Sequence, residues 1–402
     1  MNVYLINPIN KECELKLSQF NLIDLTEVKP DNHLHMFNVD FSYRKTKFGI
    51  ELSEFELQLY LKHYMAWRYF SHTEEPYCLI IENIASVIQS GESILEVISN
   101  FSNDCDVFFP YNGLKRATRP PQITYLLGYR WGIDAYFISQ NAARIFLETT
   151  TIKQPIDEEI FEMFKLGRIN IYYEDTNLFC WGTDDIYRAD RNETIKKAIL
   201  DLDVWGENDK SRARNLIKTT FELASHAGCE FFLSDGTLLG HIRHGQIMQW
   251  DDDIDISLNI ENLNVFLKAI EVERSLEICK RYWGVNRILY FKIWDASGTE
   301  IPNKKYKFPF MDVWLYKIDG ETLLYNYGAR YPISIIFPLQ SVSFEQSSAF
   351  VPVEPLSYLD IKYRSWRDTI QVFPLSHRTE TRKFIPLKAE IETDSFGRIV
   401  TR

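Results

Sequence analysis

The feature that most constrains this chain is a run of aspartates at the start of an apolar strand pattern. Residues 231–258 read FFLSDGTLLGHIRHGQIMQWDDDIDISL, so four aspartates fall within the five positions from Asp251 to Asp255, and apolar residues alternate over 254–258. In an extended strand, side chains two positions apart lie on the same face. We therefore expect Asp253 and Asp255 to project together while the apolar residues enter a core.

Such a cluster needs a neutralising partner. At an effective dielectric constant of about 20, charges a few ångströms apart repel strongly, so buried carboxylates persist at neutral pH only beside a cation. Oxygen-only ligand sets favour Mg²⁺ or Mn²⁺, and we predict that such an ion is bound by Asp251, Asp253 and Asp255. A solvated acidic loop stays open as an alternative. A calcium-binding EF-hand loop is excluded, because its template requires Gly and Glu where this chain has Ile256 and Asn262.

A second element of the same predicted site lies upstream of the aspartates. The turn at 234–237, SDGT, follows a predicted strand over 229–233 and precedes a predicted helix over 238–244. Glycine permits close backbone approach, a threonine can cap the helix, and the N–H groups at a helix start suit phosphate. We therefore predict phosphate contacts from Ser234, Gly236 and Thr237, with an ordinary turn as the alternative.

A third element is an aspartate inside the apolar segment FPFMDVWLY at 308–316. An unpaired aspartate in a buried strand is costly, so Asp312 needs a partner. We favour a metal shared with Asp253 and Asp255 over an arginine or a backbone cap. Nearby basic residues are predicted phosphate contacts, each with a surface position as the alternative: Arg243, His244 and Lys292.

These elements resemble the LicD family, which includes fukutin and its relatives and is a branch of the nucleotidyltransferase superfamily. The family pattern is a Gly-Thr-Leu-Leu-Gly turn, an Arg-His pair, Trp-Asp-Asp-Asp-Ile-Asp, and a later apolar strand with one aspartate. This chain carries the pattern in that order, at 236–240, 243–244, 250–255 and 312. The likeness extends over about residues 206–380. It departs from the family after Tyr363, where the family usually has a glycine and this chain has Arg364 and Ser365.

The resemblance implies an α+β nucleotidyltransferase fold and the transfer of a phosphorylated alcohol, such as phosphocholine or ribitol phosphate. The donor would be linked to cytidine diphosphate (CDP), and the acceptor would be a hydroxyl of a glycan or lipid-linked oligosaccharide at the cell surface. Asp253 and Asp255 would hold Mg²⁺ on the diphosphate, and Asp312 would bind the metal and steer or deprotonate the acceptor hydroxyl. These three residues are the predicted catalytic set.

Length and charge distribution predict two domains. At about 150 residues per domain, 402 residues allow two or three. A strongly charged stretch predicts a helical linker over 183–205 between a first domain, 1–182, and a second, 206–402. In the first domain, apolar runs such as 77–81 and 135–139 alternate with helical patterns such as 53–70, which predicts an α/β fold.

The first domain is similar to glycosyltransferase family 25, which implies a GT-A-like fold that binds a nucleotide sugar. The similarity covers about residues 1–175 and rests on 3–7, 52–67, 79–82 and 132–139. Where that family has Glu-Asp-Asp, this chain has Glu82-Asn83-Ile84, and one carboxylate is too few to hold the metal of a sugar nucleotide. We therefore expect an inactive or altered domain that presents the acceptor.

Composition limits the partners and the location. The 56 acidic residues exceed the 45 basic ones, and the net charge of −11 argues against binding to nucleic acid. The six cysteines are widely spaced, and we find neither a signal peptide nor an apolar run of membrane-spanning length. We expect a cytoplasmic protein, and we leave open a peripheral association with the inner face of the membrane.

Three hypotheses follow from the sequence. The leading one is a Mg²⁺-dependent phosphotransferase of the LicD type. The second is a bifunctional enzyme whose first domain also transfers a sugar, and the third is a non-catalytic scaffold that binds glycans through its many aromatic residues, 14% of the chain. The intact set of Asp253, Asp255 and Asp312 favours the first.

Overall fold

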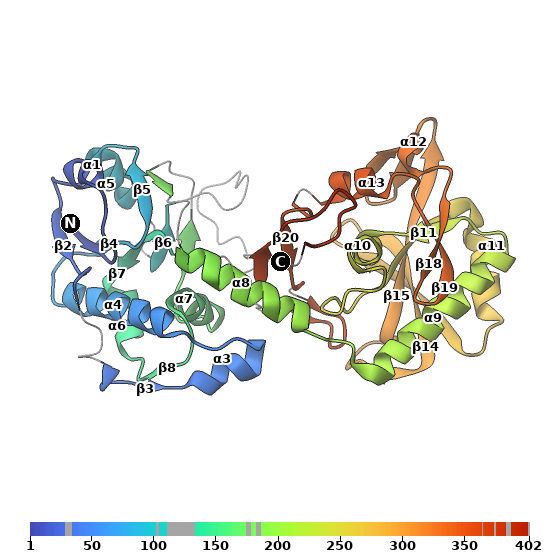
Figure 1. The fold of residues 1–402 in the computed structure, drawn as a ribbon, viewed down its shortest axis with the longest axis horizontal. Coiled ribbons are helices and arrows are strands. Elements are labelled where there is room, and N and C mark those ends of the chain that lie inside the picture. Colours follow the sequence, from blue (N-terminus) through green and yellow to red (C-terminus); the bar gives the residue numbers. More distant parts are fainter. Residues whose placement is uncertain are drawn as a thin grey trace. The chain divides into compact units, whose positions relative to one another are not determined.

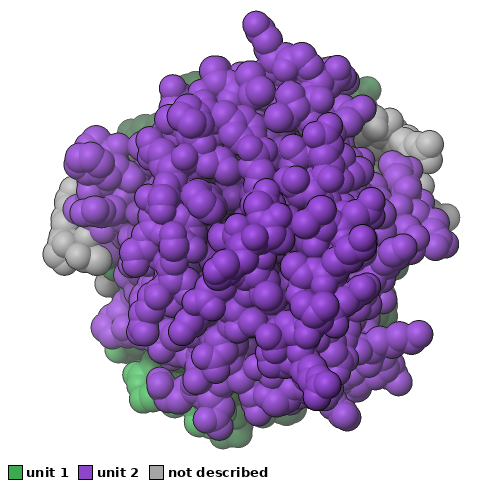
Figure 2. Space-filling view, turned by 90° about the vertical axis from the view of Figure 1, so that its right-hand side faces the viewer, with its two compact units in different colours: residues 1–194 green, residues 195–402 purple. Residues whose placement is uncertain are grey.

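The computed structural model describes residues 1–28, 34–101, 104–110, 133–173, 178–181, 186–363, 365–373, 375–382 and 387–400. Three sequence features fall outside these residues: the start of the predicted linker (183–185), Gly132 of the glycosyltransferase likeness, and Arg364. The chain divides into two compact units, residues 1–194 and 195–402, and the division lies in helix α8 (Ile186–Asp201) (Figure 1). Figure 2 shows one face of the second unit in purple.

The described part of the first unit is a mixed α/β structure around a six-stranded sheet. The strand order is β2-β1-β4-β7-β6-β9, in which β7 is antiparallel to both of its neighbours and the other pairs are parallel. The strands of this sheet are β1 (Asn2–Leu5), β2 (Asn21–Asp24), β4 (Tyr77–Ile81), β6 (Val107–Phe109), β7 (Ala135–Ser139) and β9 (Ile171–Tyr173). Two short ladders pair β3 (Asn38–Val39) with β8 (Thr151–Ile152) and β5 (Ile84–Val87) with β10 (Phe179–Trp181).

The helices of this unit follow the sequence pattern closely. The helix expected from Ser53 is α4 (Glu54–Phe70), and Ser53 and Glu56 form a reciprocal capping box at its start. The apolar runs at 77–81 and 135–139 are β4 and β7, so the predicted α/β alternation is confirmed. The other helices are α1 (Lys11–Lys16), α3 (Phe41–Phe48), α5 (Gly91–Ser99), α6 (Gln140–Leu147) and α7 (Ile156–Lys165).

Glu82, the single acid of the predicted glycosyltransferase motif, lies in a buried polar network. Its Oε2 atom is 3.0 Å from Nε2 of His63, and Nδ1 of His63 is 2.9 Å from the hydroxyl of Tyr136. That hydroxyl also accepts a hydrogen bond of 3.0 Å from Nε1 of Trp67. The carboxylate of Glu82 therefore already has a polar partner within the protein, His63. The GT-A-like assignment of this unit stays a prediction.

A second buried polar network holds α3, α4 and α7 together. Arg44 is 1% exposed and donates to Glu56 and Glu158, with nitrogen–oxygen distances of 3.0 Å and 2.7 Å for the closest pairs. Arg191 adds a 2.8 Å ion pair with Asp157 of α7. Removing one member of such a network leaves uncompensated buried charge, which costs more than the pair contributes by forming.

We therefore predict that Arg44→Met, which keeps the side-chain volume but not the charge, destabilises the first unit by about 3 kcal/mol. Urea unfolding of the full chain measures this change. The matched control is Lys45→Met, which breaks an exposed pair with Glu51 and should leave the free energy of unfolding almost unchanged. Equal destabilisation by the two variants would contradict the prediction.

The second unit is built on a curled seven-stranded sheet, as far as the described residues extend. Its main order is β11-β12-β15-β14-β13, and β16 and β17 continue from β15. The strands are β11 (Phe231–Leu233), β12 (Asp255–Asn259), β13 (Leu276–Trp283), β14 (Ile288–Glu300), β15 (Lys307–Asp319), β16 (Thr322–Tyr325) and β17 (Arg330–Pro332). Among these pairs only β12 and β15 run parallel.

Helix α9 (Gly206–His226) packs against β14, β15 and β19 (Ser347–Val351) (Figure 1). The apolar stripe of Leu216, Ile217, Phe221 and Ala224 predicts a helix over 213–227, and the structure starts this helix seven residues earlier. Glu207 and Asp209 in its first turn explain the extension, because acidic residues stabilise a helix N-terminus. The helix stops where predicted, before Gly228, whose φ of +66° suits a residue without a side chain.

The remaining elements surround this sheet and helix. They are α10 (Asp235–His244), a 3₁₀ turn η1 (Ile260–Asn262), α11 (Leu263–Glu271), α12 (Ile333–Ile336), α13 (Pro355–Lys362) and the paired strands β18 (Gln340–Phe344) with β19 (Ser347–Val351), β20 (Thr369–Gln371) with β23 (Lys388–Glu390), and β21 (Leu375–Ser376) with β22 (Thr381–Arg382). Across the described part of the chain, no helix has the length and apolar character needed to span a membrane.

Candidate functional site

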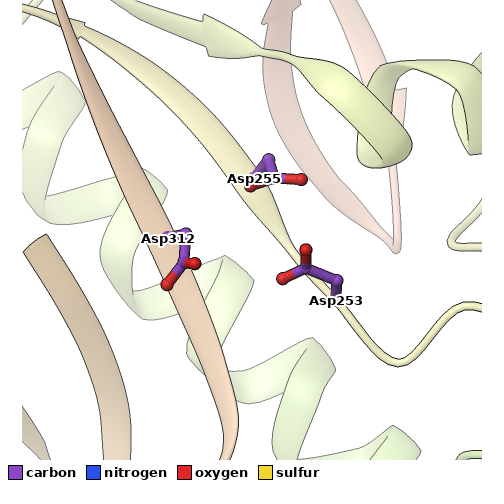
Figure 3. A group of neighbouring side chains, drawn as sticks. All are labelled: Asp253, Asp255 and Asp312. Carbon is purple, nitrogen blue, oxygen red and sulfur yellow. The ribbon is translucent and has the colours of Figure 1, made fainter. Parts of the chain in front are cut away.

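Three aspartates from two parallel strands and one loop converge in the second unit. Asp255 of β12 and Asp312 of β15 are directly paired in the ladder, and Asp253 precedes β12 by two residues. One carboxylate oxygen of each lies within 4.8 Å of the others, and Figure 3 shows the three side chains facing a common space. The structure thus brings together the three residues predicted as the catalytic set.

The path of the chain differs in one respect from the sequence prediction. Asp253 and Asp255 were expected to share a strand face, but β12 begins only at Asp255, so Asp253 lies in the preceding loop. Ile254, between them, is fully buried as expected. The carboxylates meet nevertheless, since one oxygen of Asp253 lies within 4.8 Å of oxygens of Asp255 and Asp312.

The electrostatics of the cluster are those of crowded, buried acids. Burial and the charge of Asp253 raise the pKa of Asp251 to about 7. Burial, and then repulsion from Asp253, raise the pKa of Asp255. Burial also raises the pKa of Asp312, to about 6, although the ammonium of Lys292 opposes the shift. The protein alone therefore does not compensate these charges fully.

The donor set fits a hard divalent cation. Three carboxylates supply oxygen ligands, and Oδ1 of Asp253 is buried without a hydrogen-bond partner among the described residues. Mg²⁺ and Mn²⁺ prefer oxygen ligands and are commonly held by one or two carboxylates together with substrate phosphates. Asp253, Asp255 and Asp312 are thus the residues that would hold such an ion.

Lys292 is bound to one of these acids. It lies opposite Asp312 in the β14–β15 ladder, and its Nζ atom donates to both carboxylate oxygens, at 2.7 Å and 3.0 Å. The ammonium also lies 3.5 Å from the ring centroid of Phe310, and the side chain is 2% exposed. Lys292 therefore orients the carboxylate of Asp312. The predicted contact of Lys292 with phosphate stays a prediction.

Two hydrogen bonds fix Asp255. Its backbone N–H donates to Oγ1 of Thr237 at 2.7 Å, and its Oδ1 accepts from Nε1 of Trp314 at 2.9 Å. Thr237 was expected to cap a helix starting at 238. The helix is α10 and starts at Asp235, with Ser234 as its N-cap, so the predicted capping role of Thr237 is wrong. Its hydroxyl instead ties α10 to β12.

The first turn of α10 brings its backbone close to the acids. A Cβ atom at position 236 would lie 2.6 Å from Oδ2 of Asp251, so glycine is what lets this carboxylate approach the start of the helix. The hydroxyl of Ser234 is buried with no hydrogen-bond partner among the described residues, and Asp235 adopts a φ of +49°. Gly236 faces the cavity, as the phosphate prediction requires, but phosphate contacts by Ser234, Gly236 and Thr237 stay predictions.

Arg243 and His244 differ in their surroundings. Arg243 is buried and donates to the backbone carbonyls of Trp366 and Thr369, the second at 2.8 Å, and burial lowers its pKa to about 10. It lines the cavity while holding the segment after α13. His244 is exposed and meets Trp250 edge-on at 5.1 Å between ring centroids. Their predicted contacts with phosphate remain untested.

The middle aspartate of the run has a separate role that the sequence did not indicate. Oδ2 of Asp252 accepts hydrogen bonds from the backbone N–H groups of His377 and Arg378, at 3.0 Å and 3.3 Å. His377 Nε2 lies 3.5 Å from Oδ2 of Asp253. Although burial lowers the pKa of His377, Asp253 and then Glu380 raise it to about 10 overall. His377 and Arg378 thus hold Asp252 and Asp253 in place through these contacts.

A cavity of about 390 Å³ opens beside the cluster. Four aspartates line it together with two basic residues and a set of aromatic rings: Asp235, Asp251, Asp253, Asp255, Arg243, Lys362, Trp250, Trp283, Trp314, Tyr327, Tyr363, Trp366 and Phe373. Asp312, Ser234, Thr237, His244 and Lys292 are described residues that lie outside this lining. The volume is that of a small-molecule site.

Lys362 and Asp235 form an ion pair in this cavity that sequence reasoning missed. Nζ of Lys362 bonds Oδ1 of Asp235 and donates to the hydroxyl of Tyr327 at 3.2 Å. Both residues lie beside predicted motif positions, but a lone lysine at the end of a helix gives no signal in a single sequence. Only the packing of α13 against α10 brings them together.

The raised pKa values predict how pH and metal affect stability. Between about pH 4 and pH 7 the folded protein binds more protons at Asp251 and Asp312 than the unfolded chain does, so their contribution to the free energy of unfolding falls as pH rises. A fixed Mn²⁺ concentration, about 100 times the dissociation constant at pH 7.5, should therefore stabilise the full chain by about 2–3 kcal/mol at that pH and much less near pH 5, where protons compete for the carboxylates. Thermal unfolding with and without Mn²⁺ measures this, and equal or absent stabilisation at the two pH values would contradict it.

The support given by Asp252 predicts a second stability change. Asp252→Ala removes the acceptor of two backbone N–H groups and should lower the free energy of unfolding by about 1–2 kcal/mol. Asp252→Asn keeps one acceptor oxygen and should cost less. Urea unfolding of both variants is the measurement, and an alanine variant as stable as the wild type would refute the anchoring role.

Comparison with known proteins places this site in a family context. The model of the family "LicD/FKTN/FKRP, nucleotidyltransferase domain" matches residues 228–354. The chain is 30% identical over 107 residues to the lipopolysaccharide cholinephosphotransferase LicD of Haemophilus influenzae, which covers 23% of this chain and 38% of that protein. It is 24% identical over 156 residues to an uncharacterized protein of Rickettsia typhi and 26% identical over 161 residues to one of Rickettsia prowazekii.

These matches cover only part of each protein. Each Rickettsia match covers 38% of this chain and 45% or 53% of the relative, so the chain spans about half or less of the length of the curated relatives it matches. The comparisons give no support to the predicted glycosyltransferase family 25 likeness of the first unit. The converging aspartates and the residues of α10 all lie within the matched segment. Residues 228–354 of this chain are therefore similar to the nucleotidyltransferase domain of the LicD family.

Proposed function

We propose that the second unit transfers a phosphorylated alcohol from a CDP-linked donor to a sugar hydroxyl, with a divalent cation bound by Asp253, Asp255 and Asp312. The convergence of these three carboxylates at the edge of a ligand-sized cavity carries the proposal. The family match and the printed name of the Haemophilus relative, a lipopolysaccharide cholinephosphotransferase, support a transferase of this kind.

The chemistry follows from charge placement. A bound Mg²⁺ or Mn²⁺ would offset the negative charge of the donor diphosphate and of the leaving cytidine monophosphate (CMP). In the protein, Asp255 is fixed by Trp314 and Thr237, and Asp312 by Lys292, so two of the three ligands are preorganised. Because Lys292 holds Asp312 as a carboxylate, we propose that Asp312 chiefly binds the metal and orients the acceptor hydroxyl.

The rest of the cavity would bind the donor phosphates. The backbone at Gly236 opens onto the cavity at the start of α10, a ten-residue helix whose N-terminal dipole favours anions. Lys362 and Arg243 add positive charge on the same lining. These groups would hold the diphosphate while the acids hold its cation.

Among the alcohols that the sequence left open, we propose phosphocholine over ribitol phosphate. Trimethylammonium groups are recognised by the faces of aromatic rings, with carboxylates nearby to balance the charge. The lining offers several such rings beside its four aspartates. A polyol would instead call for a dense set of neutral hydrogen-bonding side chains.

The proposal extends to the acceptor and the place of action. We propose a glycan or lipid-linked oligosaccharide as acceptor, at the inner face of the membrane, and a first unit that presents it. These parts rest on the family likeness alone, because the chain spans only about half or less of the length of its curated relatives.

The activity is tested by release of CMP from CDP-choline in the presence of Mg²⁺ and acceptor glycan. Asp253→Asn, Asp255→Asn and Asp312→Asn should each lower the rate about a thousandfold, since a metal ion supplies several kcal/mol and about 1.4 kcal/mol corresponds to a factor of ten. The same assay with CDP-ribitol in place of CDP-choline tells the two alcohols apart, and we expect faster release of CMP from CDP-choline.

The matched control is Asp319→Asn, which changes an exposed aspartate at the far end of the strand that carries Asp312. This variant should keep wild-type activity. Release of CMP that is unaffected by the three site variants would overturn the proposed function.

A further inference from the structure

Two exposed aromatic residues lie at the rim of the cavity, where the phosphoryl-transfer site does not use them. Trp283, the last residue of β13, is 56% exposed, and Phe373, two residues after β20, is 51% exposed. Both line the cavity, as do the exposed polar residues Ser365 and Gln371. The rim therefore combines aromatic faces with hydrogen-bonding side chains.

Trp283 continues an aromatic wall that starts at the acids. Nε1 of Trp314 donates to Oδ1 of Asp255 at 2.9 Å. The ring of Trp283 meets Trp314 edge-on, with 6.3 Å between centroids and an interplanar angle of 89°. Tyr290 stacks on Trp314 at 4.7 Å and supports it. The wall thus leads from an expected metal ligand to the solvent.

We infer that this rim, with Trp283 as its main contact, is the subsite for the acceptor sugar. The inference rests on the proposed function. The donor diphosphate has to lie against the acids inside the cavity, whereas an acceptor glycan brings one hydroxyl to the phosphorus and keeps its remaining sugars in solvent. The acceptor therefore occupies the opening.

The chemistry of the rim suits a sugar ring. One face of a pyranose presents C–H groups that pack on an aromatic ring, and its hydroxyls need polar partners at the edges. Trp283 and Phe373 supply the faces, and Gln371 and Ser365 supply an amide and a hydroxyl. A lipid surface or protein partner would call for a continuous apolar patch, and here polar side chains interrupt the rings.

Neighbouring Tyr282 provides a matched control. It belongs to the same strand and is 52% exposed, but it alternates to the opposite face of β13 and is absent from the residues that line the cavity. Arg287 lies over its ring at 4.8 Å, on that other side. Tyr282→Ala thus removes an equally exposed aromatic ring from the same hairpin without touching the rim.

The first experiment measures sugar binding without activity. Saturation-transfer difference NMR of the full chain with Mg²⁺ uses the methyl glycosides of glucose, galactose, N-acetylglucosamine and N-acetylgalactosamine as probes. We expect a signal for at least one glycoside with the wild type and Tyr282→Ala, and its loss with Trp283→Ala. An unchanged signal in Trp283→Ala, or no signal for any glycoside with the wild type, would overturn the inference.

The second experiment uses kinetics with CDP-choline. Trp283→Ala should raise the acceptor KM about tenfold and the donor KM far less. A change confined to the donor KM would place Trp283 at the nucleoside and refute the acceptor role. If Trp283→Ala loses binding to anionic vesicles but keeps the sugar signal, the rim contacts a membrane and the acceptor role is refuted.

The two proposals fail separately. If the wild type releases no CMP from any CDP-linked alcohol but Trp283 still governs glycoside binding, the proposed function fails and the sugar subsite stands. If CMP release depends on Asp253 but glycoside binding is the same in Trp283→Ala as in the wild type, the sugar subsite is refuted and the proposed function stands. Thermal unfolding of Trp283→Ala should match that of the wild type, because the removed ring is mostly exposed.

Discussion

The side-by-side burial of two carboxylates in neighbouring parallel strands is the constraint on which the second unit depends. Asp255 and Asp312 occupy the same register position of the β12–β15 ladder, and the chain adds Asp253 to the same space. Like charges this close and this buried destabilise a fold unless cations or hydrogen-bond donors offset them. The surrounding structure supplies part of that compensation, and a divalent ion is the simplest source of the rest.

Residues far apart in the sequence each offset the charge of one of these carboxylates. Lys292 from β14 binds Asp312, Thr237 and Trp314 fix Asp255, and His377 approaches Asp253. Asp252, which looks like a further ligand in the sequence, instead anchors the turn that carries His377. The acidic run is therefore a set of differently engaged side chains, and the segment beyond residue 354 belongs to the site although the family match ends there.

The sequence predicted the parts of this site that depend on local patterns. The alternation over 254–258 identified β12, the apolar run around Asp312 identified β15, and charge repulsion indicated that their acids need one partner. The pattern placed the start of β12 too early, because the alternation of side chains does not show where strand pairing begins. It also missed Asp235 with Lys362, and the roles of Asp252 and His377, since each depends on a contact between segments more than a hundred residues apart. In the first unit the α/β rhythm was predictable, whereas the His63–Glu82 network was not, because nothing local links a helix residue to the end of β4.

Anomalous diffraction from crystals of the full chain soaked with Mn²⁺ tests the metal site most directly. We predict an anomalous peak within bonding distance, about 2.1 Å, of carboxylate oxygens from Asp253, Asp255 and Asp312, with Lys292 still hydrogen-bonded to Asp312. A peak elsewhere, or an unoccupied cluster in which Lys292 alone neutralises the acids, would contradict the shared-metal site.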